Sequence, residues 1–98
     1  MQSITALTLK QKLDDHEDLQ LIDVREADEH AEFNISGELI PLGEIVQKID
    51  RISKDKPVVF YCRKGIRSQV AIQRLTEKFP FKNLYNLIGG TEAWRRQF

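Results

Sequence analysis

Apolar residues along the chain form short runs separated by longer stretches of helical spacing. Runs at 19–24 and 57–61 predict buried strands, the second strongly because it is rich in β-branched and aromatic residues. Residues 84–88 predict a further strand. The segment 38–41 predicts a short strand that ends at Pro41, since proline cannot donate to a sheet ladder.

Helical patterns occupy the segments between these strands. An apolar stripe at offsets of 0, 3, 4, 7 and 10 predicts a helix facing the core, formed by Leu42, Ile45, Val46, Ile49 and Ile52. A capping box at Thr8-Leu9-Lys10-Gln11 predicts a helix over 9–15. Further helical sequence leads to Phe33, runs from Ser68 to Phe79 and fills 91–98. The alternation predicts an α/β fold, with a parallel sheet flanked by helices on both faces and functional loops beyond the carboxyl ends of the strands.

Composition narrows the class of protein. The 98 residues are 41% hydrophobic and 31% charged, which predicts one globular domain spanning 1–98. No signal peptide or membrane-spanning run is present, so we expect a cytoplasmic protein. The single cysteine, Cys62, forbids an internal disulfide. His16 and His30 form no ligand pair and are predicted to lie on the surface, so we expect no metal and no other cofactor.

Charge is balanced overall but divided along the chain. Fifteen basic and fifteen acidic residues give a net charge of zero, which argues against nucleic acid and anionic membranes as partners. Residues 1–50 hold four bases and twelve acids, net −8, whereas residues 51–98 hold eleven bases and three acids, net +8. We therefore expect an anion-binding site in the second half.

One loop in that half combines the thiol with basic residues. The segment Cys62-Arg63-Lys64-Gly65-Ile66-Arg67-Ser68 joins a predicted central strand to a predicted helix, and no acidic residue lies between Asp55 and Glu77. The helix start directs N–H groups and its positive dipole end at the loop, and Gly65 lets the backbone turn its amides inward. These effects favour the thiolate, so Cys62 is predicted to be a nucleophile with a pKa below the free value of about 8.5.

Cys62 also has a purely structural interpretation. A lone cysteine after an apolar strand is often only a small buried hydrophobe. Three cations and a glycine within five residues of the thiol favour function instead, because burying them without anionic partners would be costly.

Several segments match one known family in its own order. They are Leu21-Ile22-Asp23-Val24-Arg25-Glu26, Ile35-Ser36-Gly37 with Ile40-Pro41-Leu42, the segment Tyr61–Ser68, and Asn86-Leu87-Ile88-Gly89-Gly90 with Trp94. The resemblance that they carry covers nearly the entire chain, and in this order the segments are far more specific than any one alone. The chain resembles the rhodanese family in its single-domain form.

This resemblance implies a small rhodanese-like domain with a central, mainly parallel five-stranded sheet and sulfurtransferase chemistry on Cys62. The thiolate would take the outer sulfur of thiosulfate or of a persulfide donor and hold it as a persulfide for a thiol or sulfur-carrier protein. Backbone amides of residues 63–67 would hold the anionic sulfur, and Arg63, Lys64 and Arg67 would attract the small anionic donor. Lys64 matches a loop lysine that some thiosulfate-using rhodaneses carry.

Two alternatives remain open. Tyrosine phosphatases and related enzymes place five residues between their cysteine and arginine, whereas four separate Cys62 from Arg67, so a Cys-dependent phosphatase or arsenate reductase is a less favoured enzyme. Rhodanese-like domains also act as non-catalytic binding or regulatory modules, although those often lack the cysteine.

Residues outside the loop receive supporting roles. In the family, the segment that matches Asp23 and Arg25 braces loops near the active site. Asn34 stands where a histidine is frequent and Glu38 where a small residue is usual, which puts in doubt the detail of that turn and its contact with a donor. Trp94 is predicted to pack the last helix onto the core.

Overall fold

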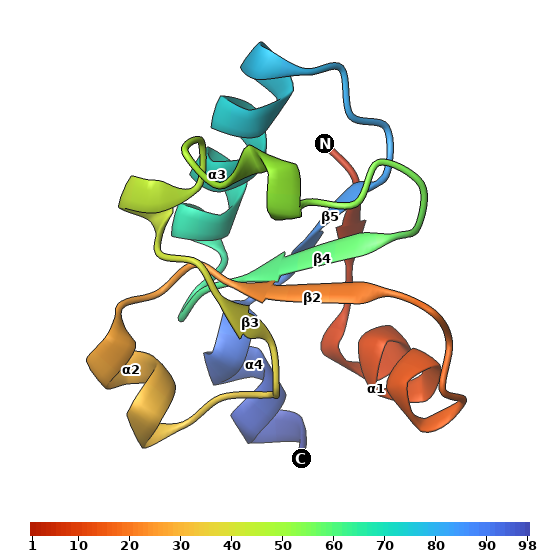
Figure 1. The fold of residues 1–98 in the computed structure, drawn as a ribbon. Helices are drawn as coiled ribbons and strands as arrows, with labels where there is room; N and C mark the ends of the chain where they lie inside the picture. The colour runs from red at the N-terminus through yellow and green to blue at the C-terminus, as the bar shows by residue number, and fades with distance from the viewer.

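Five strands form one parallel sheet in the order β1-β5-β4-β2-β3 in the computed structural model, which describes residues 1–98 (Figure 1). The strands are β1 (Ser3–Ile4), β2 (Gln20–Asp23), β3 (Glu38–Leu39), β4 (Val58–Tyr61) and β5 (Leu84–Leu87). The helices are α1 (Ala6–Asp14), α2 (Ala27–Glu32), α3 (Ile66–Lys78) and α4 (Gly90–Gln97). The predicted α/β class with a parallel sheet is confirmed. None of these helices is long and apolar enough to cross a bilayer.

The central strand β4 shows why both faces of the sheet carry a core. All four of its side chains are buried, and successive side chains point to opposite faces. Val58 and Phe60 join a cluster with α3, whereas Val59 and Tyr61 join a second cluster with α1 and α4. Figure 1 shows these helices on opposite sides of the sheet. Trp94 packs against the second cluster from α4, as predicted.

The segment 42–52 does not form the predicted α-helix. It folds as two 3₁₀ turns, Leu42–Glu44 and Ile49–Arg51, joined by further turns. The apolar stripe still reaches the core, where Ile45 is fully buried and its neighbours pack around it. Spacing of three to four residues suits an irregular turn as well as a helix, and Gly43 with the β-branched pair Ile45-Val46 disfavours the helix.

The first helix begins earlier than the capping box predicts. Thr5, not Thr8, is the N-cap residue, and its hydroxyl accepts a hydrogen bond from the Thr8 amide at 3.2 Å. Thr8 therefore lies inside the first turn. The added residues bury Ala6 against the second cluster, which explains the earlier start.

The carboxyl ends of β2, β4 and β5 meet at one edge of the sheet. The Val24 amide bonds to the Tyr61 carbonyl at 3.0 Å, which brings the segment after β2 beside the segment after β4. The Thr91 amide bonds to the Cys62 carbonyl at 2.9 Å, which brings the start of α4 there as well. This edge is where a parallel sheet is expected to bind ligands.

Candidate active site

Cys62 follows β4 directly, and the loop after it folds around the sulfur. Residues 62–68 are called the Cys62 loop below. Cys62 is 1% exposed, and its Sγ accepts hydrogen bonds from the Gly65 amide at 3.1 Å and the Ser68 amide at 3.4 Å. The Ser68 hydroxyl oxygen also lies 3.4 Å from Sγ. Cys62 thus packs at the edge of the first core cluster, but its sulfur receives hydrogen bonds that an ordinary core cysteine lacks.

Two glycines give the loop its shape. Gly65 has a φ of 97°, a conformation that side chains rarely adopt, and this turns its amide toward the sulfur. Gly90 has a φ of 57°, and a Cβ there would lie 2.6 Å from the Arg63 carbonyl and overlap the Cys62 carbonyl oxygen. The Cys62 loop therefore rests on the bare backbone at the start of α4.

The pKa of Cys62 reflects burial opposed by hydrogen bonds. Burial raises the pKa of the thiol, but bonds from the Ser68 hydroxyl and from the amides of Ser68, Gly65 and Lys64 outweigh it. The pKa of Cys62 therefore lies below its ordinary value, the direction that the sequence predicts.

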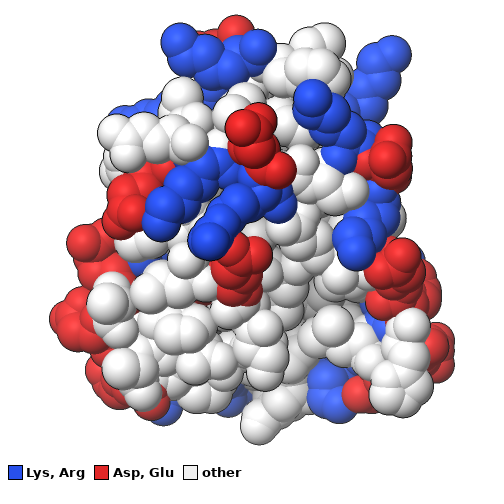
Figure 2. Space-filling view, viewed as in Figure 1, with Lys and Arg blue, Asp and Glu red and all other residues white.

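The positive charge of the Cys62 loop is largely neutralised by acids from distant segments. Arg67 makes two hydrogen bonds, of 2.7 and 2.8 Å, to the Glu29 carboxylate of α2. Arg63 pairs with Glu92 of α4 at 3.0 Å. The sequence interpretation of an uncompensated cation cluster is wrong, because acids absent nearby in sequence are supplied by the fold. Basic and acidic groups also lie side by side over much of the face in Figure 2.

Lys64 is the exception in the loop. It is exposed and forms no ion pair, unlike both loop arginines. Ile66 is also exposed, at the first turn of α3. Lys64 is therefore the one loop cation whose charge is not already paired with a carboxylate.

Asp23 and Arg25 form a buried brace at the end of β2. Arg25 binds both Asp23 carboxylate oxygens, at 3.0 and 2.8 Å, and donates to the Phe33 carbonyl at 2.6 Å. Burial raises the pKa of Asp23, but the hydrogen bonds from Arg25 and His30 outweigh burial. The pKa of Asp23 therefore lies below its ordinary value. His30 is predicted to lie on the surface, but in the structure it is half-buried. Its Nδ1 lies 2.8 Å from Oδ2 of Asp23. The brace fixes α2, and with it Glu29, against the end of the sheet.

Comparison with known proteins decides the family. The sequence model of one protein family, the rhodanese-like domain, matches residues 5–97. This chain belongs to the rhodanese-like domain family. It is 41% identical over 95 residues to the putative sulfurtransferase YtwF of Bacillus subtilis (strain 168), covering 96% of this chain and 90% of that protein.

Two further matches agree with this assignment. The rhodanese-like domain is 38% identical over 79 residues to the thiosulfate sulfurtransferase GlpE of Coxiella burnetii (strain RSA 331 / Henzerling II), covering 80% of this chain and 73% of that protein. Among solved structures, a rhodanese-like domain protein from Staphylococcus aureus superposes with a TM-score of 0.85 at 30% identity, covering 96% and 91% of the two chains.

Sequence reasoning missed one buried residue of the site, Asn86. Its Oδ1 lies within hydrogen-bond distance of the Ser68 hydroxyl, which gives its one hydrogen either to Oδ1 or to the sulfur, so Ser68 links Asn86 to Cys62. Asn86 is 4% exposed in the middle of the apolar strand β5. A lone amide in such a run was the available signal, since buried polar groups require partners.

The two departures from the family pattern have local roles in this rhodanese-like domain. Asn34 accepts the Ser36 amide at 2.8 Å and donates to the His30 carbonyl at 2.9 Å, which stabilises the turn after α2. Glu38 forms an exposed ion pair with Arg51 at 2.9 Å. Neither side chain bonds to the Cys62 loop.

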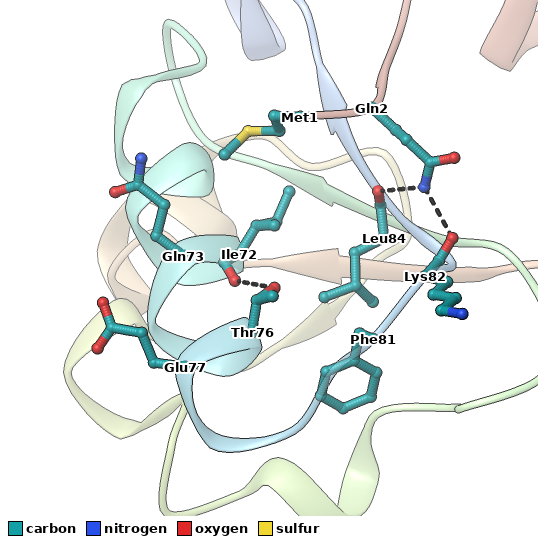
Figure 3. Close-up of a pocket in the computed structure, with 9 residues that line it drawn as sticks. All are labelled: Met1, Gln2, Ile72, Gln73, Thr76, Glu77, Phe81, Lys82 and Leu84. Atoms are coloured by element: carbon teal, nitrogen blue, oxygen red, sulfur yellow. Dashed lines mark hydrogen bonds between the residues drawn. The ribbon is translucent and has the colours of Figure 1, made fainter.

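The largest hollow of the rhodanese-like domain lies away from the thiol. It is lined by Ile72 and Thr76 of α3, by Phe81 and Leu84, and by the N-terminal residues (Figure 3). Leu84 begins β5, so this hollow opens at the amino end of the strands, opposite Cys62. No group of three or more His, Cys, Asp and Glu side chains is placed to hold a metal ion.

Proposed function

We propose that this protein is a rhodanese-type sulfurtransferase that carries a sulfane sulfur as a persulfide on Cys62. The proposal is supported by one observation above all. Amide hydrogens of Gly65 and Ser68 point at a buried sulfur whose pKa is lowered, so negative charge on that sulfur is stabilised without a neighbouring general base.

In the first half-reaction, the Cys62 thiolate attacks the outer sulfur of thiosulfate. A new S–S bond forms to Sγ, the S–S bond of thiosulfate breaks, and its electron pair leaves with sulfite. The exposed ammonium of Lys64 attracts the dianion and the departing sulfite. The loop amides then stabilise the charge on the cysteine persulfide.

In the second half-reaction, a nucleophilic acceptor attacks the outer persulfide sulfur. The S–S bond breaks, and its electron pair returns to Sγ as thiolate, so the protein is regenerated unchanged. Cyanide would leave as thiocyanate, and a thiol would become a persulfide. Because Cys62 is the only cysteine, no second thiol of this chain intercepts the sulfur, and the acceptor is a separate thiol or sulfur-carrier protein.

The position of Arg67 argues against a phosphatase or arsenate reductase. A phosphate-binding loop needs its arginine free to form a two-point bond with the oxyanion. Here Glu29 already holds Nη1 and Nη2 of Arg67. A phosphate could bind Nη1 and Nη2 together only by displacing Glu29, and otherwise only the Nε side of this guanidinium is open to it.

Mass spectrometry of the intact protein tests the proposal. Thiosulfate should add one sulfur atom to the wild-type chain and none to Cys62→Ser, and cyanide should remove the added atom. A non-catalytic binding module would gain no sulfur at all. Equal gains by both chains would overturn the assignment to Cys62.

A further inference from the structure

A small cavity lies beside the Cys62 loop, on the side of β1 and β5. Its volume is about 320 Å³, and its lining includes Lys64, Gly65, Gln69, Asn86 and Ile88 but not Cys62. No acidic residue lines it, and Lys64 is its one charged side chain. The cavity thus differs from the polar pocket between α2 and α4, whose lining includes three glutamates, Glu29, Glu32 and Glu92, as well as arginines.

Asn86 places an unused donor in this cavity. Its side chain is almost wholly buried, and Oδ1 is occupied by the Ser68 hydroxyl, but Nδ2 has no hydrogen-bond partner in the protein. Asn83 Oδ1 is the only polar side-chain atom that is both sealed from solvent and unpaired, so Nδ2 of Asn86 reaches accessible space. Nδ2 also faces Gly65, because it lies 3.6 Å from where a Cβ at that position would be.

We propose that this cavity is a second binding site, for a small oxyanion, formed by Lys64, Gln69 and Asn86. The ammonium of Lys64 supplies charge, and the amides of Asn86 and Gln69 supply hydrogen-bond donors. Gln69 makes no side-chain bond within the protein and lies one turn into α3, so its amide is available. A sulfate or carboxylate ligand requires hydrogen-bond donors that no acidic side chain of the protein already occupies.

Occupation of the cavity is coupled to Cys62 through Ser68. The Ser68 hydroxyl has one hydrogen, which it gives either to Asn86 Oδ1 or to the sulfur. If the Asn86 amide turns, Nδ2 bonds to the Ser68 oxygen, and the hydroxyl hydrogen becomes free to stabilise the thiolate. An anion bound to Nδ2 opposes this turn and also repels negative charge on Sγ. Both effects favour the thiol over the thiolate.

Binding is tested by titrating sulfate into isotopically labelled Cys62→Ser protein, in which no sulfur transfer occurs. We expect saturable NMR shifts of the Asn86 and Gln69 side-chain amides, with a Kd on the order of 1 mM. Gln69→Glu places a repelling charge at the cavity and should weaken binding at least roughly tenfold. Gln73→Glu places the same charge one turn further along α3, on the hollow of Figure 3, and should change the Kd by less than about twofold. An unmoved Asn86 amide, or equal weakening by both variants, would overturn the site.

Coupling is tested on wild-type protein by the rate of Cys62 alkylation at constant ionic strength. Saturating sulfate should slow alkylation at pH 7 by roughly threefold, equivalent to about half a pKa unit. This protection should disappear in Gln69→Glu and persist in Gln73→Glu. Protection that survives in Gln69→Glu would show that sulfate acts at the thiol itself. Because neither test uses thiosulfate, their outcome is independent of the proposed sulfur transfer.

Discussion

Arg67, the last cation of the Cys62 loop, holds Glu29 of α2 through two parallel hydrogen bonds across 38 residues of sequence. This pair joins the loop that surrounds the thiol to the helix that follows β2. It also removes one positive charge from the reach of a donor. The loop is therefore less cationic than its sequence, and its main means of stabilising a charged sulfur are the backbone amides.

The Arg67–Glu29 pair predicts a stability difference that depends on pH. The bond from Arg67 lowers the pKa of Glu29 from 4.5 to about 2. A lowered folded-state pKa contributes stability that is complete above pH 4.5 and is lost as pH falls toward 2. At pH 7, Glu29→Gln should lower the free energy of unfolding by about 1 kcal/mol, and this difference should vanish near pH 2.

Urea denaturation across pH measures this difference, with Glu32→Gln as the control, since Glu32 lies on α2 and forms no ion pair. A Glu29→Gln difference that stays constant from pH 7 to pH 2 would contradict the role given to the pair.

The buried brace predicts a larger effect. Arg25→Met leaves the fully buried Asp23 carboxylate without its main partner, which should lower the free energy of unfolding by roughly 3–5 kcal/mol. The double variant Asp23→Asn, Arg25→Met should recover part of this loss, because no unpaired charge remains. Urea denaturation measures both. A loss below about 1 kcal/mol for Arg25→Met would show that the brace is not a stabilising element.

Gly90 predicts a coupling between α4 and the thiol. Gly90→Ala forces a Cβ into the Cys62 and Arg63 carbonyls at a φ that alanine rarely adopts, so we expect a loss of roughly 1–3 kcal/mol and slower persulfide formation. Gly43→Ala is the matched control, because a Cβ there meets no atom within 4 Å. Equal stability and equal rates of persulfide formation in the two variants would show that the contact between Gly90 and the Cys62 loop supports neither.

Most of the strands and all four α-helices were predictable from the sequence, at least in outline, whereas the turns of segment 42–52 were not. The run at 57–61 forms β4 because β-branched and aromatic residues fit a strand buried on both faces. The stripe from Leu42 to Ile52 specifies only which side chains face the core, and turns satisfy it as well as a helix does. Strand β1, two residues at the edge, is too short to give a periodic signal of its own.

The site was predictable where its chemistry is local in sequence. Cys62, Gly65 and Ser68 lie within one loop, so their spacing reveals an amide-lined sulfur. Glu29 and Glu92 reach the same loop only through the fold, and no pattern in one sequence pairs them with Arg67 and Arg63. The electrostatic interpretation failed for that reason, although the prediction of a lowered thiol pKa agrees with the structure.

Ser68 predicts a shift in the titration of the thiol. Ser68→Ala removes a hydroxyl that can donate to the thiolate, so the pKa of Cys62 should rise. The rate of alkylation as a function of pH reports this value in both proteins. In the wild type, alkylation should remain fast below the free-thiol pKa of about 8.5. An unchanged profile in Ser68→Ala would assign the lowered pKa to the backbone amides alone.

The central claim, that Cys62 accepts the outer sulfur of a donor, is tested most directly with thiosulfate labelled in one sulfur at a time. After incubation and proteolysis, the mass of the peptide that contains Cys62 is measured by mass spectrometry. Outer-labelled thiosulfate should give a heavy persulfide on Cys62, while inner-labelled thiosulfate should give an unlabelled persulfide and heavy sulfite. A peptide that retains the inner sulfur, or that gains no sulfur from either reagent, would contradict the claim.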